Sequence, residues 1–282
     1  MRKARAGMAR PGRTGLVATH AVLIAGAALM VLPFAWEVLT ALKTLSESLA
    51  APPRVFPAAA QWGNFAAVFD AVPFGAQFRN TVIMTLLRTA GQVFLSAAAG
   101  FAFARLEFPF KRAIFAVFLS MLMIPPQLFI LSQYQVIQSL GLLNTVIALA
   151  LPGMFGAFGV FLTRQYFLQV PDELMDAARL DGANVPQIFF RVMLPLTRNG
   201  LVALGILAAI WAWNDLLWPL VVNSTPDKLS LSAGLAFMQG QFTTNYPMLM
   251  AGATLASLPM IVLFVVFQKR MIEGIAAGGI KG

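Results

Sequence analysis

The chain has 282 residues, of which 59% are hydrophobic and only 11% are charged, whereas a typical soluble domain carries about 25% charged residues. With a mean hydropathy of +0.77, the sequence excludes a single soluble globular domain, because such a surface needs more charge, and it equally excludes disorder. The remaining class is a polytopic membrane protein. The sequence has no cysteine and one histidine, His20, so it predicts no metal site and no cysteine nucleophile.

Six segments are long and apolar enough to cross about 30 Å of hydrocarbon as helices. The sequence therefore predicts an all-α membrane protein with six transmembrane helices. The expected spans are residues 15–42, residues 80–104, two spans within the charge-free stretch 113–163 with a turn at 141–144, residues 199–222 and residues 246–267.

The distribution of basic residues predicts the orientation. Most of the 20 Lys and Arg side chains fall in the N-terminal segment, the second–third loop, the fourth–fifth loop and the C-terminal segment, and the alternate loops hold only Lys43, Arg54, Arg79 and Lys228. Because Lys and Arg concentrate on the cytoplasmic side, both termini are expected in the cytoplasm. The net charge of +9 is then mostly a topology signal, and we expect membrane lipid rather than nucleic acid around the chain.

The predicted organisation has three parts. A cytoplasmic tail (1–14) precedes one six-helix membrane domain (15–271), and a second cytoplasmic tail (272–282) follows it. A long cytoplasmic loop (167–197) joins the fourth and fifth spans. No cleaved signal peptide is expected, because the first apolar run is longer than a signal's apolar region and has no obvious cleavage site.

That loop predicts a helix–glycine–helix elbow. Pro171 suits the first position of a helix, and acidic residues follow it at the positive end of the helix dipole. Gly182 fits a left-handed stop, and Asn184 with Gln187 has the sequence of a capping box. The expected apolar ridge consists of Leu174, Ala177, Ala178, Ile188 and Phe189. The residues alone leave open whether the elbow packs on its own bundle or presents a rigid surface to a cytoplasmic partner.

The elbow carries three blocks at fixed spacing. Asp176-Ala177-Ala178 is followed after three residues by Gly182, after nine more by Val192, and after one more by Leu194-Pro195. This pattern resembles the EAA motif of bacterial ABC importer permeases, with Asp in place of Glu and Val in place of Ile. Further similarity at Trp213-Asn214-Asp215 and in the C-terminal residues 274–282 points to the carbohydrate-uptake branch, and to its maltose-type second permease.

The resemblance implies a subunit rather than a complete machine. Family members pair with a second homologous permease, a dimer of ATPase subunits and an extracellular solute-binding protein, in the bacterial inner membrane. The sequence contains no phosphate-binding Gly-rich motif, so ATP and magnesium are expected on the partner ATPase and no cofactor on this chain. The implied ATPase-coupling residues are Asp176, Ala177, Ala178, Asp181, Gly182, Ala183, Leu194 and Pro195.

Polar residues within the spans are candidates for the translocation path. A charge at membrane depth costs at least about 2.5 kcal/mol, so Arg88 is expected to pack into the bundle, paired with an acid or reaching toward the interface. Pro125-Pro126 is expected to break the third span, and broken helices often line binding sites. The candidate path residues are Gln127, Gln133, Tyr134, Trp211, Trp213, Asn214 and Asp215. Interfacial tryptophans and interhelical hydrogen bonds are an equal alternative for these residues.

Three functions compete at this point. The leading hypothesis is the permease subunit of an ATP-driven importer of a sugar or oligosaccharide, and glycerol-3-phosphate or a glycerophosphodiester is the alternative substrate. A self-sufficient secondary transporter is the rival class, but it would need coupling-ion sites and would not need an exposed elbow. A membrane enzyme is disfavoured, because the sequence has no Ser/His/Asp set and no paired catalytic carboxylates.

Overall fold

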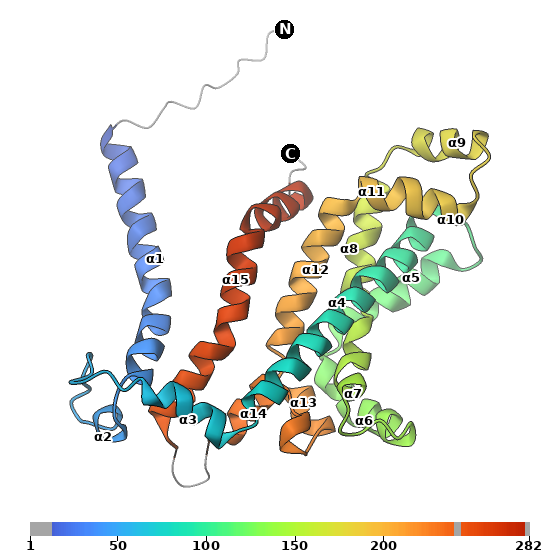
Figure 1. Ribbon diagram of the computed structural model, residues 1–282. Coiled ribbons are helices and arrows are strands. Elements are labelled where there is room, and N and C mark those ends of the chain that lie inside the picture. Colours follow the sequence, from blue (N-terminus) through green and yellow to red (C-terminus); the bar gives the residue numbers. More distant parts are fainter. Residues whose placement is uncertain (1–12, 240–243, 280–282) are drawn as a thin grey trace. The chain divides into compact units, whose positions relative to one another are not determined.

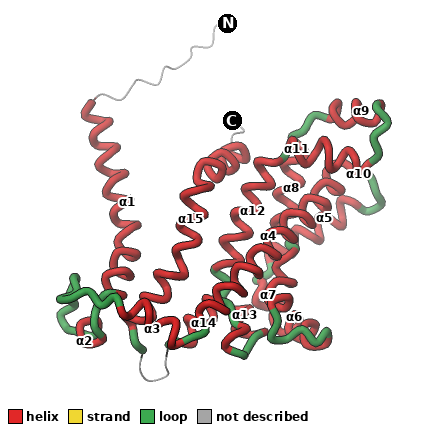
Figure 2. The backbone as a smooth tube through the Cα atoms, viewed as in Figure 1, coloured by secondary structure: helices red, strands yellow, loops and turns green. Residues whose placement is uncertain are grey.

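The computed structural model describes residues 13–239 and 244–279. In these ranges the regular elements are all helices (Figure 2), which confirms the predicted all-α class. The chain divides into two compact units. The first comprises Met1–Ala67 with Asn245–Thr254, and the second comprises Val68–Thr244 with Leu255–Gly282.

The first unit contains a long apolar helix and a folded loop. Helix α1 (Arg13–Ala41) agrees with the first predicted span to within two residues at either end. Beyond it the Lys43 side chain is buried, with Nζ 2.6 Å from the carbonyl oxygen of Arg54 and 4.3 Å from the centre of the Trp36 ring. These contacts hold the loop after α1 in a defined conformation.

The second unit is organised around α4 (Phe74–Arg105), which has 32 residues and is long enough to span a bilayer at about 1.5 Å per residue. It packs most extensively against α8 (Ala157–Leu168) and α12 (Arg198–Trp213). Between α4 and α8, the Thr163 hydroxyl donates to the carbonyl oxygen of Ser96 across 2.7 Å. Small and hydroxyl-bearing residues let membrane helices approach closely, which fits the extensive packing of α4 on α8.

The other helices are shorter or cross the boundary between the units. They are α2 (Leu45–Ser48), α3 (Gly63–Ala71), α5 (Lys111–Ser120), α6 (Ile130–Ser139), α7 (Val146–Ala150), α9 (Asp172–Leu180), α10 (Val185–Ile188), α11 (Leu194–Leu196), α13 (Leu217–Val222), α14 (Leu231–Phe237) and α15 (Tyr246–Gly279).

Several helices in the second unit are bent pairs. The pairs are Lys111–Met123 with Pro126–Ser139 (101°), Val146–Met154 with Ala157–Leu168 (47°), and Val185–Leu196 with Arg198–Trp213 (79°). The first break lies at Pro125-Pro126, as predicted, because proline lacks a backbone donor and its ring clashes with the preceding turn. By length and composition, the described residues contain three helices able to cross a membrane, or up to six if each bent pair is one span.

The fifth predicted span is wrong at its C-terminal end. Helix α12 stops at Trp213 instead of continuing to residue 222, and α13 is a separate helix. The Asn214 amide donates to a carbonyl one turn back at 2.8 Å, and Asp215 Oδ1 accepts from the Trp218 N–H at 3.4 Å. Such local side-chain bonds compete with the backbone bonds of the helix, so the two polar residues end α12.

Two further boundaries differ from the prediction. Helix α4 begins at Phe74 rather than at Asn80. Helix α15 continues past the expected end of the sixth span, so the predicted tail (272–282) is helical as far as Gly279. The predicted N-terminal tail lies outside the described residues, apart from its last two positions.

Candidate functional site

The first part of the site is α9, at one end of the second unit (Figure 1). Pro171 has an extended backbone and lies directly before the helix, whereas the sequence predicted it at the first helical position. Asp172 and Glu173 occupy the first turn and Arg179 the last. This order of charges complements the helix dipole, which explains why so short a segment forms a helix.

Gly182 turns the chain after α9. Its φ is +80°, a left-handed conformation in which a residue with a Cβ is strained. Asn184 then caps α10, because its side chain accepts from the Gln187 N–H at 2.9 Å and the Gln187 side chain accepts from the Asn184 N–H at 2.8 Å. The predicted left-handed stop and capping box are both confirmed.

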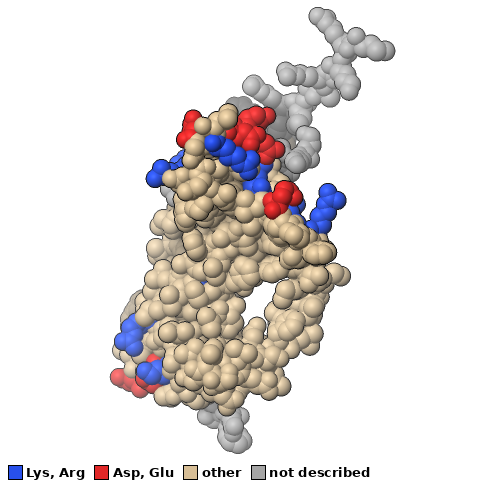
Figure 3. Space-filling view, turned by 90° about the vertical axis from the view of Figure 1, so that its right-hand side faces the viewer, with Lys and Arg blue, Asp and Glu red and all other residues tan. Residues whose placement is uncertain are grey.

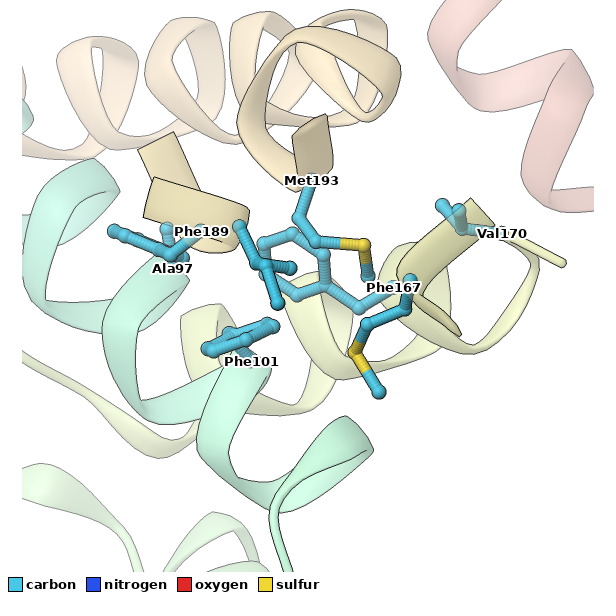
Figure 4. Packing of buried hydrophobic residues seen from close by; sticks show 8 residues of the cluster. Ala97, Phe101, Phe167, Val170, Phe189 and Met193 are labelled. Carbon is cyan, nitrogen blue, oxygen red and sulfur yellow. The ribbon is translucent and has the colours of Figure 1, made fainter. Parts of the chain in front are cut away.

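An aromatic cluster, which we call the elbow cluster, holds α9 and α10 against the ends of α4 and α8 (Figure 4). Its buried members are Ala97, Phe101, Phe167, Val170, Met175, Ile188, Phe189 and Met193. The Phe101 ring centre lies 5.8 Å from that of Phe167 and 5.2 Å from that of Phe189, within the range in which aromatic pairs stabilise a core. The elbow therefore packs on its own bundle.

The apolar ridge predicted for the elbow is partly wrong. Ile188 and Phe189 are buried as expected, but α9 buries Met175, and Leu174 and Ala177 are exposed. Successive helical residues are about 100° apart around the helix axis, so burying Met175 instead of Leu174 turns a different face of α9 toward the bundle. The helix consequently keeps the first residues of its motif free of the bundle.

Two arginines tie the base of the elbow to the helix ends. Arg105, the last residue of α4, donates to carbonyl groups at the end of α8, including that of Phe167 at 2.6 Å, and pairs with Asp172. In return Arg164 of α8 donates to the carbonyl oxygen of Phe103 at 3.2 Å. The Arg105 side chain is only 6% exposed. Charge-assisted bonds of this kind are stronger than neutral ones, and here they satisfy carbonyls that a helix end leaves free.

The predicted coupling residues divide into two groups. Those at the surface are Asp176, Ala177, Asp181, Gly182 and Pro195, and those partly buried on the elbow cluster are Ala178, Ala183 and Leu194. Asp176 and Arg179 form an exposed ion pair at 3.0 Å. In Figure 3 the end that carries α9 shows blue and red side chains above a tan central band. The motif thus presents a small, polar outer face on an apolar base.

The motif ends in a widened helical turn. Residues Phe189–Met193 form a π-helix, and α11 with Pro195 follows directly. A π turn changes the hydrogen-bond register, which accommodates a proline that has no N–H to donate. The carbonyl oxygen of Met193 accepts from both the N–H and the hydroxyl of Thr197, at 3.1 and 2.8 Å. The chain then bends from the elbow into α12.

The second part of the site is a pair of adjoining cavities beside the helix breaks, with volumes of about 450 and 280 Å³. Both are lined by Arg88, Pro126, Gly153 and Asp215. The larger one also borders Gln92, Phe155 and Trp211, and the smaller one also borders Gln127 and Gln133. A broken helix leaves backbone that can line a polar site within a bundle.

An ion pair borders both cavities. Arg88 Nη1 lies 2.6 Å from Asp215 Oδ2, and the Arg88 and Asp215 side chains are 9% and 22% exposed. Arg88 also donates from Nε to the carbonyl oxygen of Leu149 at 2.9 Å. A Cβ at Gly153 would lie 2.7 Å from Arg88 Cδ, so the absence of a side chain there makes room for the arginine. The expectation that Arg88 packs into the bundle, paired with an acid, is confirmed.

The cavities bring some of the candidate path residues together and not others. Gln127, Gln133, Trp211 and Asp215 line them. Trp213 is buried and donates from Nε1 to the carbonyl oxygen of Ala256 at 3.0 Å. Tyr134 packs against an apolar cluster that includes Trp218. Asn214 ends α12. These last three side chains have structural contacts instead.

Sequence reasoning missed four residues that shape the site, namely Arg105, Arg164, Gln92 and Gly153. Gln92 follows Arg88 by one helical turn, a spacing that places both on one face, so the periodicity contained this signal. The two arginines were counted only as topology markers. Gly153 had no signal, because its role depends on a side chain distant in the sequence.

An all-helical membrane chain with a polar cavity at its helix breaks and an anchored surface elbow is the architecture of a membrane transport subunit. A family model described as "Binding-protein-dependent transport system inner membrane component" matches residues 92–273. The chain belongs to this family. It is therefore a multi-pass inner-membrane permease subunit of an ABC importer, and not an enzyme.

Curated relatives agree with the family. The arabinooligosaccharides transport system permease protein AraQ of Halalkalibacterium halodurans is 38% identical over 220 residues, which cover 78% of this chain and 79% of the relative. The sn-glycerol-3-phosphate transport system permease protein UgpE of Pectobacterium atrosepticum is 31% identical over 272 residues, which cover 93% and 97%. The resemblance predicted from the EAA-like spacing is confirmed, and the alternative of a self-sufficient secondary transporter is not supported.

A solved structure shares the fold. It is described as the crystal structure of a bacterial ABC transporter involved in the import of the acidic polysaccharide alginate. One of its chains matches with a TM-score of 0.78 and 20% sequence identity, covering 93% of this chain and 99% of that one.

Proposed function

We propose that the chain is one of two homologous permeases of the importer and that α9 with its following turn is the coupling helix. In this arrangement six spans cross the membrane, both termini lie in the cytoplasm, and the loop 167–197 enters a cleft of a separate ATPase dimer. ATP and magnesium bind to that ATPase. An extracellular binding protein delivers the solute.

The observation that carries the coupling role is the two-sided construction of the elbow. Its base is fixed to α4 and α8 by the elbow cluster and by Arg105, while Asp176 and Ala177 are exposed. A partner that moves this helix must therefore move the ends of α4 and α8 with it. The small side chain of the exposed Ala177 lets a partner backbone approach closely, and the Asp176 carboxylate can accept from a basic partner group.

The test uses two matched glycines. Gly182 and Gly141 have φ of +80° and +69°, and a Cβ at either would meet nothing within 4 Å. Valine at each position therefore adds similar backbone strain of about 1 kcal/mol, but only Gly182 belongs to the elbow. We expect Gly182→Val to weaken co-purification of the ATPase or to uncouple ATP hydrolysis from uptake, and Gly141→Val to do neither. Equal behaviour of the two variants would contradict the coupling role.

The proposed substrate is a sugar or oligosaccharide. The arabinooligosaccharide permease relatives support it, as do the amide groups of Gln127 and Gln133 and the half-exposed Trp211 ring at the cavities. Amides bond to hydroxyl groups, and aromatic faces pack against CH groups of sugars. Glycerol-3-phosphate is the second candidate, supported by the UgpE relatives. Uptake of labelled arabinooligosaccharide and glycerol-3-phosphate by the assembled transporter distinguishes them.

A further inference from the structure

The charges that line the two cavities cancel. Arg88 and Asp215 are the charged residues among the described residues that border either cavity, and they form one ion pair with each other. The other polar side chains of the lining are amides and the indoles of Trp211 and Trp218, all of them uncharged. The cavity wall formed by this chain therefore has a net charge of zero.

Further contacts hold Arg88 and Asp215 in the positions in which they pair. Arg88 is held on one side by the Leu149 carbonyl and on the other lies close to Gly153, where an added Cβ would be 2.7 Å from its Cδ. Asp215 is fixed by its position at the end of α12, where it also accepts from the Trp218 N–H. Because α4 and the α12 end carry one charge each, neither charge is free for a solute unless these elements separate.

An anion in the cavity meets both members of this pair. It is attracted by the Arg88 guanidinium, but the Asp215 carboxylate, held against that group and more exposed, repels it. A neutral solute rich in hydroxyl groups incurs no such repulsion and finds Gln92, Gln127 and Gln133 as hydrogen-bond partners.

We propose that the Arg88–Asp215 pair is a specificity element that keeps the cavity uncharged, so that it admits neutral, hydroxyl-rich solutes and rejects anions such as phosphate esters. This inference rests on the proposed function, because it assumes that the cavities belong to the solute path. It favours a sugar over glycerol-3-phosphate as the transported class.

Trp211 borders the larger cavity and is 52% exposed overall, so its indole serves as a reporter for solutes that enter this cavity. The transporter is purified in lipid nanodiscs with its partner subunits, and tryptophan fluorescence is quenched with iodide, an anion, or with neutral acrylamide. Each variant is also made with Trp211→Phe, and the difference isolates Trp211. We expect Asp215→Asn to raise iodide quenching severalfold without changing acrylamide quenching, because it leaves Arg88 unpaired.

The control is the double variant Arg88→Gln with Asp215→Asn, which removes both charges and should match the wild type with iodide. Arg88→Gln alone should fall below the double variant, because it leaves only the carboxylate. In Asp215→Asn, sn-glycerol-3-phosphate should compete with iodide, and glycerol should not.

Equal iodide quenching in the wild type and Asp215→Asn would overturn the proposal. If Asp215→Asn does not assemble, equal quenching in Arg88→Gln and the double variant overturns it instead. Co-purification of the ATPase with the wild-type chain is measured on the same samples. Its absence would refute the proposed function, whereas the differences between variants report on the charge filter alone.

Discussion

The elbow and the cavity each depend on a buried arginine, but the two arginines stabilise their surroundings in different ways. At the elbow, Arg105 joins the ends of α4 and α8 to the start of α9 over an aromatic cluster, so polar bonds reinforce a packed contact. At the cavity, Arg88 joins α4 to the end of α12 beside open volume, so a polar bond replaces packing. A buried arginine therefore stabilises the elbow by adding polar bonds to an apolar core, and it stabilises the cavity wall where no such core is present.

The largest effect is expected at the cavity. Arg88→Met leaves the Asp215 carboxylate without its partner, and breaking such a pair costs about 3 kcal/mol or more. The double variant Arg88→Met with Asp215→Leu should recover most of this loss, because paired removal leaves no uncompensated charge. Thermal unfolding of the assembled transporter measures both. A double variant as unstable as the single one would show that the pair does not act as a unit.

The elbow should respond differently to loss of its arginine. Arg105→Gln removes charge-assisted bonds to the end of α8 and should loosen the elbow locally by about 2 kcal/mol, while the elbow cluster keeps the bundle intact. Hydrogen exchange of amides in residues 167–182 should rise, with little change in global unfolding. Lys111→Gln is the control, since Lys111 pairs with the exposed Glu107 and such pairs contribute little. A large decrease in the global unfolding temperature of Arg105→Gln would contradict the proposed difference between the elbow and the cavity.

A smaller effect should appear at Gly153. Gly153→Ala places a Cβ against Arg88 and should cost about 1–3 kcal/mol through displacement of the arginine. In the matched variant Gly156→Ala the new Cβ would lie 3.5 Å from the Gln92 amide, an ordinary contact, so its stability should be near that of the wild type. Unfolding midpoints of the two variants make the comparison. Indistinguishable midpoints would mean that the arginine is not held tightly.

The smallest effect lies outside both regions, in the loop after α1. Hydrogen bonds from the backbone N–H groups of Thr44 and Ala58 lower the pKa of Glu47. A lowered folded-state pKa means that the stabilisation is complete above the ordinary Glu pKa, about 4.3, and is lost as the pH falls through the lowered value. Pepsin cleavage within residues 44–58 should therefore increase at strongly acidic pH. Glu47→Gln should remove this pH dependence, and an unchanged dependence would contradict the role of Glu47.

Local features of the elbow and of the third span could be predicted from the sequence, because they depend on residues that are close in the chain. The left-handed Gly182, the Asn184 cap and the break at Pro125-Pro126 all follow from backbone rules over a few residues. The inward face of α9 could not be predicted, since Met175 is buried by a cluster that includes residues of α4, which are distant in the sequence. The premature end of α12 was missed for a related reason, because Asn214 and Asp215 lie in a sequence that is otherwise apolar enough to continue a span.

The cavity was only partly predictable. A polar side chain in an apolar segment marks a candidate, which identified Gln127, Gln133 and Asp215, but the same rule selected Trp213, whose indole instead bonds to α15. Which polar groups face one another depends on the bends of the broken helices, and a sequence pattern does not specify a bend of 101° or 47°.

The central claim is that the exposed face of α9 contacts the ATPase. The chain has no cysteine, so a single introduced thiol is unique within it. Ala177→Cys places a thiol on the exposed face of α9, and Ser139→Cys places one on an exposed position at the end of α6. In the assembled transporter, a maleimide that carries a benzophenone is attached to the introduced thiol, and on illumination it should join the Ala177→Cys chain to the ATPase and leave the Ser139→Cys chain unjoined. Failure of Ala177→Cys to cross-link, in a preparation where the ATPase co-purifies, would contradict the claim.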